Sequence, residues 1–306
     1  MLKQKKKIIE LCIFVLIGIT VTLLSFLPIS KNYDTSLWMS DLNDNTIINE
    51  MSIPGTHNSG SNHSIFDVSG KCQDMSISNQ LKIGVRFFDL RLQLVDNEFM
   101  IVHSFVNQKL SFISVLKYID AFIKENNEEF IIISLKEEAS SKNSIVNFDD
   151  ELYNTLVKYS SIVFDNKLPN TLGEARGKVY ILNRYSDNGI GIQAYYGWYD
   201  STSFELGDLY VQDNYCINNI EDKKRDIINA IEYNKNNDKL VINFASCYLD
   251  GKFPPTYAGT AASIINPWLL ETIEDYDNGL GIILLDFVTE ELAKEIYMRN
   301  NYEVRS

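Results

Sequence analysis

Residues 130–136 (Phe-Ile-Ile-Ile-Ser-Leu-Lys) constrain the fold more than any other stretch, because they form a nearly continuous apolar run. A strand of this composition is typical of a parallel sheet that is covered on both faces. Short apolar runs alternate with segments of helical spacing along the chain, which predicts helices packed on a parallel sheet. The expected strands are 85–92, 99–103, 130–136, 178–184, 209–214, 240–245 and 281–288, after a short strand or turn segment at 47–53.

Segments of helical periodicity connect several of these strands. About seven or eight strands in one domain of this length favour an α/β fold of the irregular, distorted TIM-type (βα) barrel over an open doubly wound sheet. The barrel is expected to be irregular because the early strands lack clear helices between them. No GxGxxG or GxxxxGK(S/T) loop follows a strand, which disfavours nucleotide-binding folds. The expected helices are 77–81, 114–126, 149–159, 222–236, 258–276 with an interruption or kink at Pro267, and 290–298.

Residues 1–30 are expected to be a targeting segment that contains an apolar helix. Four lysines between positions 3 and 7 precede an apolar run from Leu11 to Leu27, which ends at Pro28. A basic region followed by an apolar segment is typical of an export signal. The run is long for a signal peptide and slightly short for a spanning helix. We therefore expect residues 31–306 to be a single exported domain, either secreted or anchored at the outer face of the cell membrane.

The charge and the cysteines exclude several classes of function. The chain has a formal net charge of −13, and its first 30 residues hold four lysines and one glutamate, so the remainder carries −16. So acidic a domain is not expected to bind nucleic acid or to be strongly attracted to anionic lipid. The four cysteines have neither zinc-site nor redox-pair spacing, and no HExxH motif is present, so no metal site is predicted.

The segment Ile53–Ser59 runs from an apolar stretch through a turn to a histidine. Pro54-Gly55 is a strong turn signal, so the strand is expected to end there. His57 then lies on a loop just beyond the strand, where a side chain can reach a site held by a rigid scaffold. A single histidine in a polar turn is more often structural, so its meaning depends on the other strand ends.

The ends of the other predicted strands also carry polar side chains. In a βα barrel the active site lies at the carboxyl ends of the strands. Each such residue by itself has an ordinary alternative as a surface charge that ends a strand. Together they indicate phosphoryl transfer, because two imidazoles can serve as base and acid, arginine binds phosphate, and a carboxylate fixes a histidine tautomer. The candidates are His57, Asp89, Arg91, His103, Lys136, Arg184, Asp213, Tyr215 and Asp286.

Eight motifs occur in an order that resembles the bacterial phosphatidylinositol-specific phospholipases C of the X-domain family. The resemblance covers roughly residues 40–300, and together the eight motifs are highly specific although each alone is weak. The motifs are SIPGTHNS, GVRFFDLRL, IVHSF, IIISLKEE, GKVYILNRYS, YVQDNY, VINFAS with AASIINP, and GIILLDFVTEE.

The resemblance implies a distorted TIM barrel that cleaves phosphatidylinositol to diacylglycerol and inositol 1,2-cyclic phosphate. It assigns His57 as the general base, which Asp286 orients, and His103 as the general acid. Arg91 is implied to neutralise the phosphate, with Asp89 assisting Arg91 or the headgroup. The implied inositol-binding residues are Lys136, Arg184, Asp213 and Tyr215, of which the last stacks on the ring.

Asn58 departs from the bacterial pattern, which usually has Asp directly after the catalytic histidine. Asn at this place resembles the calcium-dependent members, in which it is a metal ligand. Two other ligand positions of those enzymes are acidic, but Arg91 and Lys136 occupy them here and would repel a divalent ion. We therefore expect a calcium-independent enzyme without a cofactor. Asp89 could compensate for the missing carboxylate, and Asn58→Asp is expected to leave activity equal or higher.

The expected partner is phosphatidylinositol at a membrane or micelle surface, with glycosyl-phosphatidylinositol anchors as a further possible substrate. Two aromatic-rich segments, 195–199 and 252–255, are candidates for membrane contact, and packing within the protein is the alternative. The protein is expected to be a monomer.

Two other functions stay open on the sequence. One is a catalytically weak or dead, membrane-tethered protein that binds the inositol headgroup, which loss of a catalytic histidine would favour. The other is a metal-dependent glycerophosphodiesterase, which would need acidic ligands near the first histidine. The presence of both histidines disfavours the first, and Arg91 with Lys136 disfavours the second.

Overall fold

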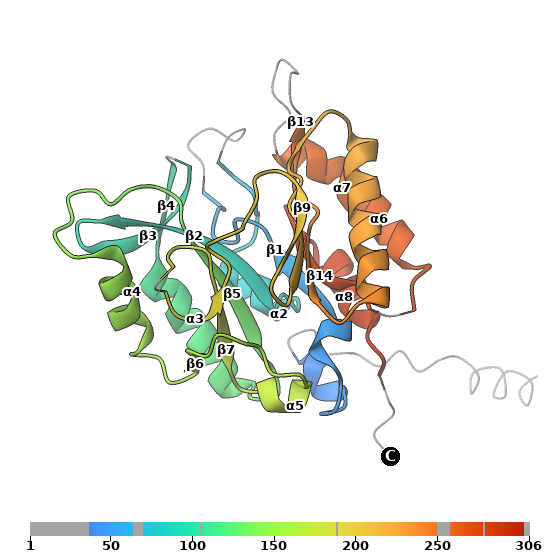
Figure 1. Ribbon diagram of the computed structural model, residues 1–306, viewed down its shortest axis with the longest axis horizontal. Coiled ribbons are helices and arrows are strands. Elements are labelled where there is room, and N and C mark those ends of the chain that lie inside the picture. The colour runs from blue at the N-terminus through green and yellow to red at the C-terminus, as the bar shows by residue number, and fades with distance from the viewer. Residues whose placement is uncertain are drawn as a thin grey trace, which may run out of the picture. The chain divides into compact units, whose positions relative to one another are not determined.

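A curled, mainly parallel sheet with helices on its outer face forms the body of the computed structural model (Figure 1). The structure describes residues 37–63, 70–104, 106–187, 189–249, 258–277 and 279–302. The expected targeting segment at 1–30 lies outside them. No helix within the described ranges has the length and apolar character needed to cross a membrane.

The main sheet has the strand order β6-β7-β5-β2-β1-β14-β12-β10-β9. Within the described residues no strand pairing joins β9 back to β6, so the barrel is open. This agrees with the prediction of an irregular barrel. The strands are β1 (Ser52–Thr56), β2 (Phe87–Val95), β5 (Ile131–Glu137), β6 (Ile162–Val163), β7 (Val179–Asn183), β9 (Ser203–Leu206), β10 (Leu209–Gln212), β12 (Leu240–Phe244) and β14 (Gly281–Leu285). Further short strands are β3 (Glu98–His103), β4 (Val106–Ser111), β8 (Ile192–Gln193), β11 (Cys216–Ile217) and β13 (Tyr248–Leu249).

The helices pack on the outside of the sheet. In Figure 1, α6, α7 and α8 lie together on one side of the sheet and α3 and α4 on the other. An interruption or kink was predicted at Pro267, and α7 runs through this residue without interruption. The described helices are α2 (Ile77–Lys82), α3 (Phe112–Glu125), α4 (Phe148–Leu156), α5 (Leu172–Ala175), α6 (Ile220–Asn236), α7 (Ala258–Ile273) and α8 (Glu290–Met298), with 3-10 turns η1 (Trp38–Asp41) and η2 (Ile48–Glu50).

Alternation along the strands divides the apolar core into two layers. Phe87, Ile132 and Ile242 belong to an inner cluster that fills the barrel, whereas Phe88 and Ile133 belong to an outer cluster packed beneath the helices. Successive side chains of a strand point to opposite faces, so each central strand is apolar on both. This explains the continuous apolar run at residues 130–136.

The prediction that a turn at Pro54-Gly55 ends the first strand is wrong. Both residues lie inside β1, which pairs with β14 from Ser52 to Thr56. Pairing with β2 begins only at Gly55, so the missing N–H of Pro54 breaks no ladder bond on that side. Gly55 permits a close approach to β2, because a Cβ at this position would lie 3.0 Å from Cβ of Phe87.

The early strands lack connecting helices because they form antiparallel hairpins. β2 pairs with β3 in antiparallel register, and β3 pairs with β4. The turn residues Asp96 and Asn97 both have positive φ, 52° and 66°, which is typical of a two-residue type I′ hairpin. β2 extends beyond its partner β5, and β3 then returns toward the body of the sheet.

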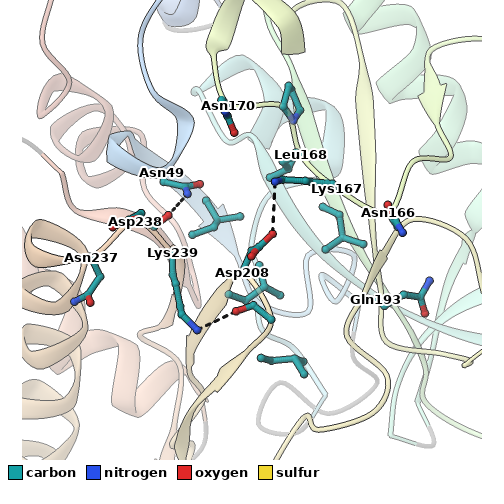
Figure 2. Close-up of a pocket in the computed structure, with 16 residues that line it drawn as sticks. Asn49, Asn166, Lys167, Leu168, Asn170, Gln193, Asp208, Asn237, Asp238 and Lys239 are labelled. Carbon is teal, nitrogen blue, oxygen red and sulfur yellow. Dashed lines mark hydrogen bonds and ion pairs between the residues drawn. The ribbon is translucent and has the colours of Figure 1, made fainter.

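Each end of the barrel has a cavity. The cavity at the amino end has a volume of about 670 Å³ and lies between residues 166–170 and the starts of β10 and β12. Figure 2 shows its amide and charged side chains, among them Asn49, Lys167 and Asp208. None of the predicted site residues lines it.

Candidate active site

The inner face of the sheet changes from apolar to charged toward the carboxyl ends of the strands. In β2 the inward side chains are Phe87, Asp89 and Arg91, and in β5 they are Ile132, Ser134 and Lys136, since alternate residues share a face. Arg91 and Lys136 are direct neighbours in the register of these strands. The same alternation places three further polar residues on the inner face, each just after the end of a strand. They are Arg184 after β7, Asp213 after β10 and Asp286 after β14.

A cavity of about 760 Å³ opens at this end of the barrel. All the predicted site residues except Asp89 line it, and Asp89 lies completely buried beside Arg91. The lining members are His57, Asn58, Arg91, His103, Lys136, Arg184, Asp213, Tyr215 and Asp286.

His57 is held from both sides of its ring. Its Nδ1 lies 2.8 Å from Oδ1 of Asp286, which is 3% exposed. A proton on Nδ1 donates to this carboxylate and leaves the lone pair on Nε2. Nε2 in turn accepts hydrogen bonds from Nη2 of Arg91 and Nδ2 of Asn58, both at 3.1 Å. The arrangement fixes one tautomer and exposes a basic nitrogen beside a guanidinium.

Asp89 joins two arginines beneath the cavity. Its carboxylate lies 3.3 Å from Nε of Arg91 and 3.3 Å from Nη1 of Arg184, and it accepts a hydrogen bond from the backbone N–H of Asn58 at 3.2 Å. Burial by itself would raise the pKa of Asp89, but Arg91 and then Arg184 outweigh it and hold the pKa well below its ordinary value. The carboxylate therefore stays ionised and fixes both guanidinium groups.

Glu138 is a site residue that the sequence analysis missed. Its carboxylate lies 3.3 Å from Nη1 of Arg91 and 3.0 Å from Nζ of Lys136, and it accepts a hydrogen bond from the N–H of Ser104. Burial would raise its pKa, but Arg91 and Lys136 lower it below the ordinary value. Despite burial, Asp89 and Glu138 together raise the pKa of Arg91. Glu138 lies two residues after Lys136 in the sequence, and this alternate spacing could have identified it as a residue of the same face.

His103 reaches the cavity because β3 runs antiparallel to β2. The carboxyl ends of the parallel strands would not include it, but the hairpin folds back and returns His103 toward Arg91. Burial, together with repulsion from His57 and Arg91, lowers the pKa of His103 below its usual value of 6.5. The ring is therefore mainly neutral at pH 7 unless an anion lies beside it.

Arg184, Trp198 and Asp213 form one wall of the cavity. The guanidinium of Arg184 lies 3.6 Å from the centre of the Trp198 ring. The indole N–H donates to Asp213 at 2.9 Å, and Arg184 lies 3.9 Å from the same carboxylate. Trp198 was predicted as a membrane-contact candidate, but it is half-buried in this wall.

The other aromatic residues of segment 195–199 are exposed. The exposed fractions are 45% for Tyr195, 69% for Tyr196 and 60% for Tyr199. Tyr195 and Tyr199 lie on the rim of the cavity. The second predicted membrane segment, 252–255, lies outside the described residues.

Tyr215 lies at the mouth of the cavity. Its hydroxyl donates to Asp200 at 2.6 Å, and this bond raises the pKa of the phenol. The nearby backbone is held by Lys223, a fully buried residue that the sequence analysis also missed. Its ammonium donates to Oε1 of Gln212 at 3.0 Å and to the carbonyl of Asn214 at 2.7 Å. Burial lowers its pKa to about 8.

Asn58 is 2% exposed and has φ 42°. Its Nδ2 lies 3.7 Å from Sγ of Cys72 in addition to its contact with His57, and its Oδ1 has no hydrogen-bond partner among the described residues. The sequence suggested no histidine–cysteine cluster because the spacings were wrong. In space, however, one ligand atom each of His57, Cys72 and Asp286 lies within 4.8 Å of the others.

Comparison with known proteins gives evidence on the family of this chain that does not depend on the geometry of the cavity. Residues 51–185 match the family described as phosphatidylinositol-specific phospholipase C, X domain. The chain is 30% identical over 267 residues to the 1-phosphatidylinositol phosphodiesterase of Staphylococcus aureus strain Newman, covering 78% of this chain and 83% of the relative. It is 28% identical over 298 residues to the 1-phosphatidylinositol phosphodiesterase of Listeria monocytogenes, covering 90% and 88%.

Two solved structures resemble the fold closely. A variant of the phosphatidylinositol-specific phospholipase C from S. aureus superposes with a TM-score of 0.79 at 25% identity, covering 89% of this chain and 98% of the other. The enzyme from L. monocytogenes gives a TM-score of 0.74 at 26% identity, covering 88% and 100%. These similarities confirm the predicted distorted TIM barrel.

Proposed function

Because this chain belongs to the bacterial phosphatidylinositol-specific phospholipases C of the X-domain family, we propose that it cleaves phosphatidylinositol to diacylglycerol and inositol 1,2-cyclic phosphate. The observation that carries the proposal is that two imidazoles and a guanidinium line the same cavity at the carboxyl end of the barrel. The reaction is an intramolecular phosphoryl transfer, so it needs a base, an acid and a counter-charge for the phosphate.

The base in this proposal is Nε2 of His57. The Asp286 carboxylate holds the Nδ1–H tautomer at 2.8 Å and stabilises the imidazolium that forms when Nε2 takes the proton of the inositol 2-hydroxyl. In the structure Nε2 accepts a hydrogen bond from Nη2 of Arg91 at 3.1 Å. A bound phosphate would draw this guanidinium to its own oxygens and leave Nε2 for the hydroxyl.

The acid in this proposal is His103, which donates a proton to the departing diacylglycerol oxygen. Its pKa is lowered below the ordinary value, first by burial. A phosphodiester anion brought beside it would favour the protonated ring and raise the pKa again. Substrate binding thereby charges the acid only when the phosphate is in place.

Arg91 is proposed to neutralise the charge that develops on the phosphate. Asp89 and Glu138 each lie 3.3 Å from it, so the fork of N–H donors is fixed before substrate arrives. Lys136, Arg184 and Asp213 are proposed to bind inositol hydroxyls, with Tyr215 against the ring. The substrate is proposed to lie in a membrane or micelle surface, and membrane binding is the subject of a solved structure of the S. aureus enzyme.

Calcium independence is part of the proposal. The cations Arg91 and Lys136 lie on the cavity wall, and their charges oppose a divalent ion held by oxygen ligands there. The N-terminal segment further leads us to propose an exported protein, secreted or anchored. N-terminal sequencing of protein recovered from the culture medium and from the membrane fraction tests this; full-length protein found only in the cytosol would contradict it.

The activity is tested with purified protein and phosphatidylinositol in detergent micelles, in the presence of a chelator. We expect soluble inositol 1,2-cyclic phosphate to accumulate in the chelator at the same rate as in its absence. Product that forms only after calcium is added would overturn calcium independence. Headgroup binding without product in either condition would overturn the catalytic proposal in favour of a binding protein. A preference for glycerophosphodiesters over phosphatidylinositol would favour the diesterase alternative.

A further inference from the structure

His57, Cys72 and Asp286 form a cluster whose chemistry the proposed reaction does not use. One ring nitrogen, the thiol sulfur and one carboxylate oxygen all lie within 4.8 Å of one another. Cys72 and Asp286 are 1% and 3% exposed. All three residues line the cavity of about 760 Å³, so an ion that enters the cavity can reach them.

We propose that this cluster binds a zinc ion and that zinc inhibits the enzyme. Sulfur, nitrogen and carboxylate oxygen together are ligands that zinc accepts in tetrahedral sites. A thiolate and a carboxylate supply two negative charges, so a divalent ion leaves the cluster neutral. Calcium and magnesium prefer oxygen ligands only, so the same cluster does not suit them.

The three ligand atoms must shift by a small distance to hold the ion. With zinc bonds of about 2.0 to 2.3 Å, ligand atoms in a tetrahedral site lie about 3.3 to 3.6 Å apart. Pairs separated by up to 4.8 Å therefore need to close by about 1 Å. The Nδ1 of His57 and Oδ1 of Asp286, now at the hydrogen-bond distance of 2.8 Å, would need to separate by about 0.5 to 0.8 Å.

Asn58 provides a second observation that points to a ligand. Its side chain is buried and lies between two members of the cluster, with Nδ2 3.1 Å from Nε2 of His57 and 3.7 Å from Sγ of Cys72. Its Oδ1 has no partner within the described part of the chain. A half-turn of the amide would direct this oxygen to the same two groups, where it would accept a hydrogen bond from Nε2–H while Nδ1 binds the ion.

Arg91 is the charge that opposes the ion, since its Nη2 lies 3.1 Å from Nε2 of His57. Its charge is already offset by Asp89 and Glu138, each at 3.3 Å. The opposition therefore weakens the site without excluding zinc.

Binding releases about one proton: the thiol must ionise, whereas the neutral imidazole keeps its single proton, which moves from Nδ1 to Nε2 when Nδ1 binds the ion. The inhibitory consequence rests on the proposed function, since zinc would occupy the cluster that contains the general base. The binding itself does not depend on that function.

The first experiment measures binding without reference to activity. The purified full-length protein is titrated with Co²⁺ as a spectroscopic substitute for zinc, and absorption from cobalt–thiolate charge transfer is recorded. We expect this band in the wild type and in Cys247→Ala, a matched variant that removes another buried thiol of the same cavity. We expect it to be lost in Cys72→Ala. A band that is absent from the wild type, or that persists in Cys72→Ala, would overturn the site.

The second experiment measures zinc inhibition of each protein relative to its own zinc-free rate. We expect the inhibitory zinc concentration to rise by about 10- to 100-fold or more in Cys72→Ala and to stay unchanged in Cys247→Ala. Equal sensitivity of Cys72→Ala and the wild type would overturn inhibition through this cluster. If Cys72→Ala does not fold, Asp286→Asn replaces it in the cobalt titration, where weaker binding is expected and unchanged binding contradicts the proposal. The cobalt titration does not depend on enzymatic activity. A failed phospholipase assay would therefore contradict the proposed function and not the metal site.

Discussion

The two ends of the barrel hold cavities of similar size, about 760 Å³ at the carboxyl end and about 670 Å³ at the amino end. The charged groups are buried in the first cavity and exposed to solvent in the second. At the carboxyl end, Arg184 and Asp89 are 6% and 0% exposed and lie 3.3 Å apart. At the amino end, Lys167 and Asp208 are 69% and 82% exposed and lie 3.9 Å apart. Volume does not distinguish the two ends, but desolvation of charge does.

This difference supports the proposal that catalysis takes place at the carboxyl end of the barrel. Taking two charges out of water costs several kcal/mol per ion unless partners compensate, so a buried network is retained where its electrostatics are used. The exposed pair at the amino end interacts through solvent and contributes about 0 to 1 kcal/mol. The comparison predicts that substitutions at the carboxyl end change catalysis, whereas matched substitutions at the amino end do not.

The largest expected effect is that of His57→Ala. Removing the general base should lower kcat about 10⁴-fold, near the upper range for acid–base catalysis. The matched change at the other cavity is Lys239→Ala, which removes a partly exposed partner of Glu205 and should change kcat by less than about twofold. Steady-state kinetics on phosphatidylinositol micelles measures both. Comparable losses in the two variants would break the contrast between the ends.

Arg91→Lys should have the next largest effect. Lysine keeps the charge but cannot contact Asp89, Glu138 and His57 together as the guanidinium does. We expect kcat to decrease about 10²- to 10³-fold, as for loss of one preorganised donor to a developing charge. Circular dichroism verifies folding. A variant with wild-type kcat would show that the fork geometry is irrelevant.

The pH dependence should show a smaller, graded effect. His103 must be protonated to act as the acid, and its pKa in the free enzyme lies below 6.5. The value of kcat/KM should therefore decrease as pH rises through that pKa, by about tenfold per unit above it. The corresponding decrease in kcat should occur at higher pH, because bound phosphate raises the pKa. Identical positions for the two decreases, or a decrease of kcat/KM that begins above pH 6.5, would contradict this assignment.

Asn58→Asp should have the smallest effect at the carboxyl end. The new carboxylate would add negative charge near Arg91, so we expect kcat to stay equal or to increase. The same steady-state assay measures it, and Asn58→Ala, which cannot supply the charge, provides the comparison. A large loss in Asn58→Asp would show that the buried amide itself, which contacts His57 and Cys72, is required.

The sequence predicted much of the fold, and nearly all of the residues that it predicted for the site line the cavity. Strand 130–136 and the helices 222–236 and 290–298 were recognisable because burial on two faces and helical periodicity are local properties. The first strand was placed wrongly because Pro54-Gly55 favours a turn in isolation, whereas in β1 the neighbouring strands fix it as extended. Glu138 and Lys223 were missed, and Trp198 was assigned to membrane contact, because their contacts in the site involve residues distant in sequence.

The sequence by itself determined the alternation of strand and helix, the order of the motifs, and the polar residues that close the inner face of each strand. These follow from periodicity, which needs no knowledge of neighbours. Only the tertiary structure decided that β3 returns His103 to the cavity, that Asp89 joins Arg91 to Arg184, and that Cys72 lies beside His57 and Asp286. Those relations depend on register and on chain segments that meet in space, and neither is encoded in the spacing of residues along the chain.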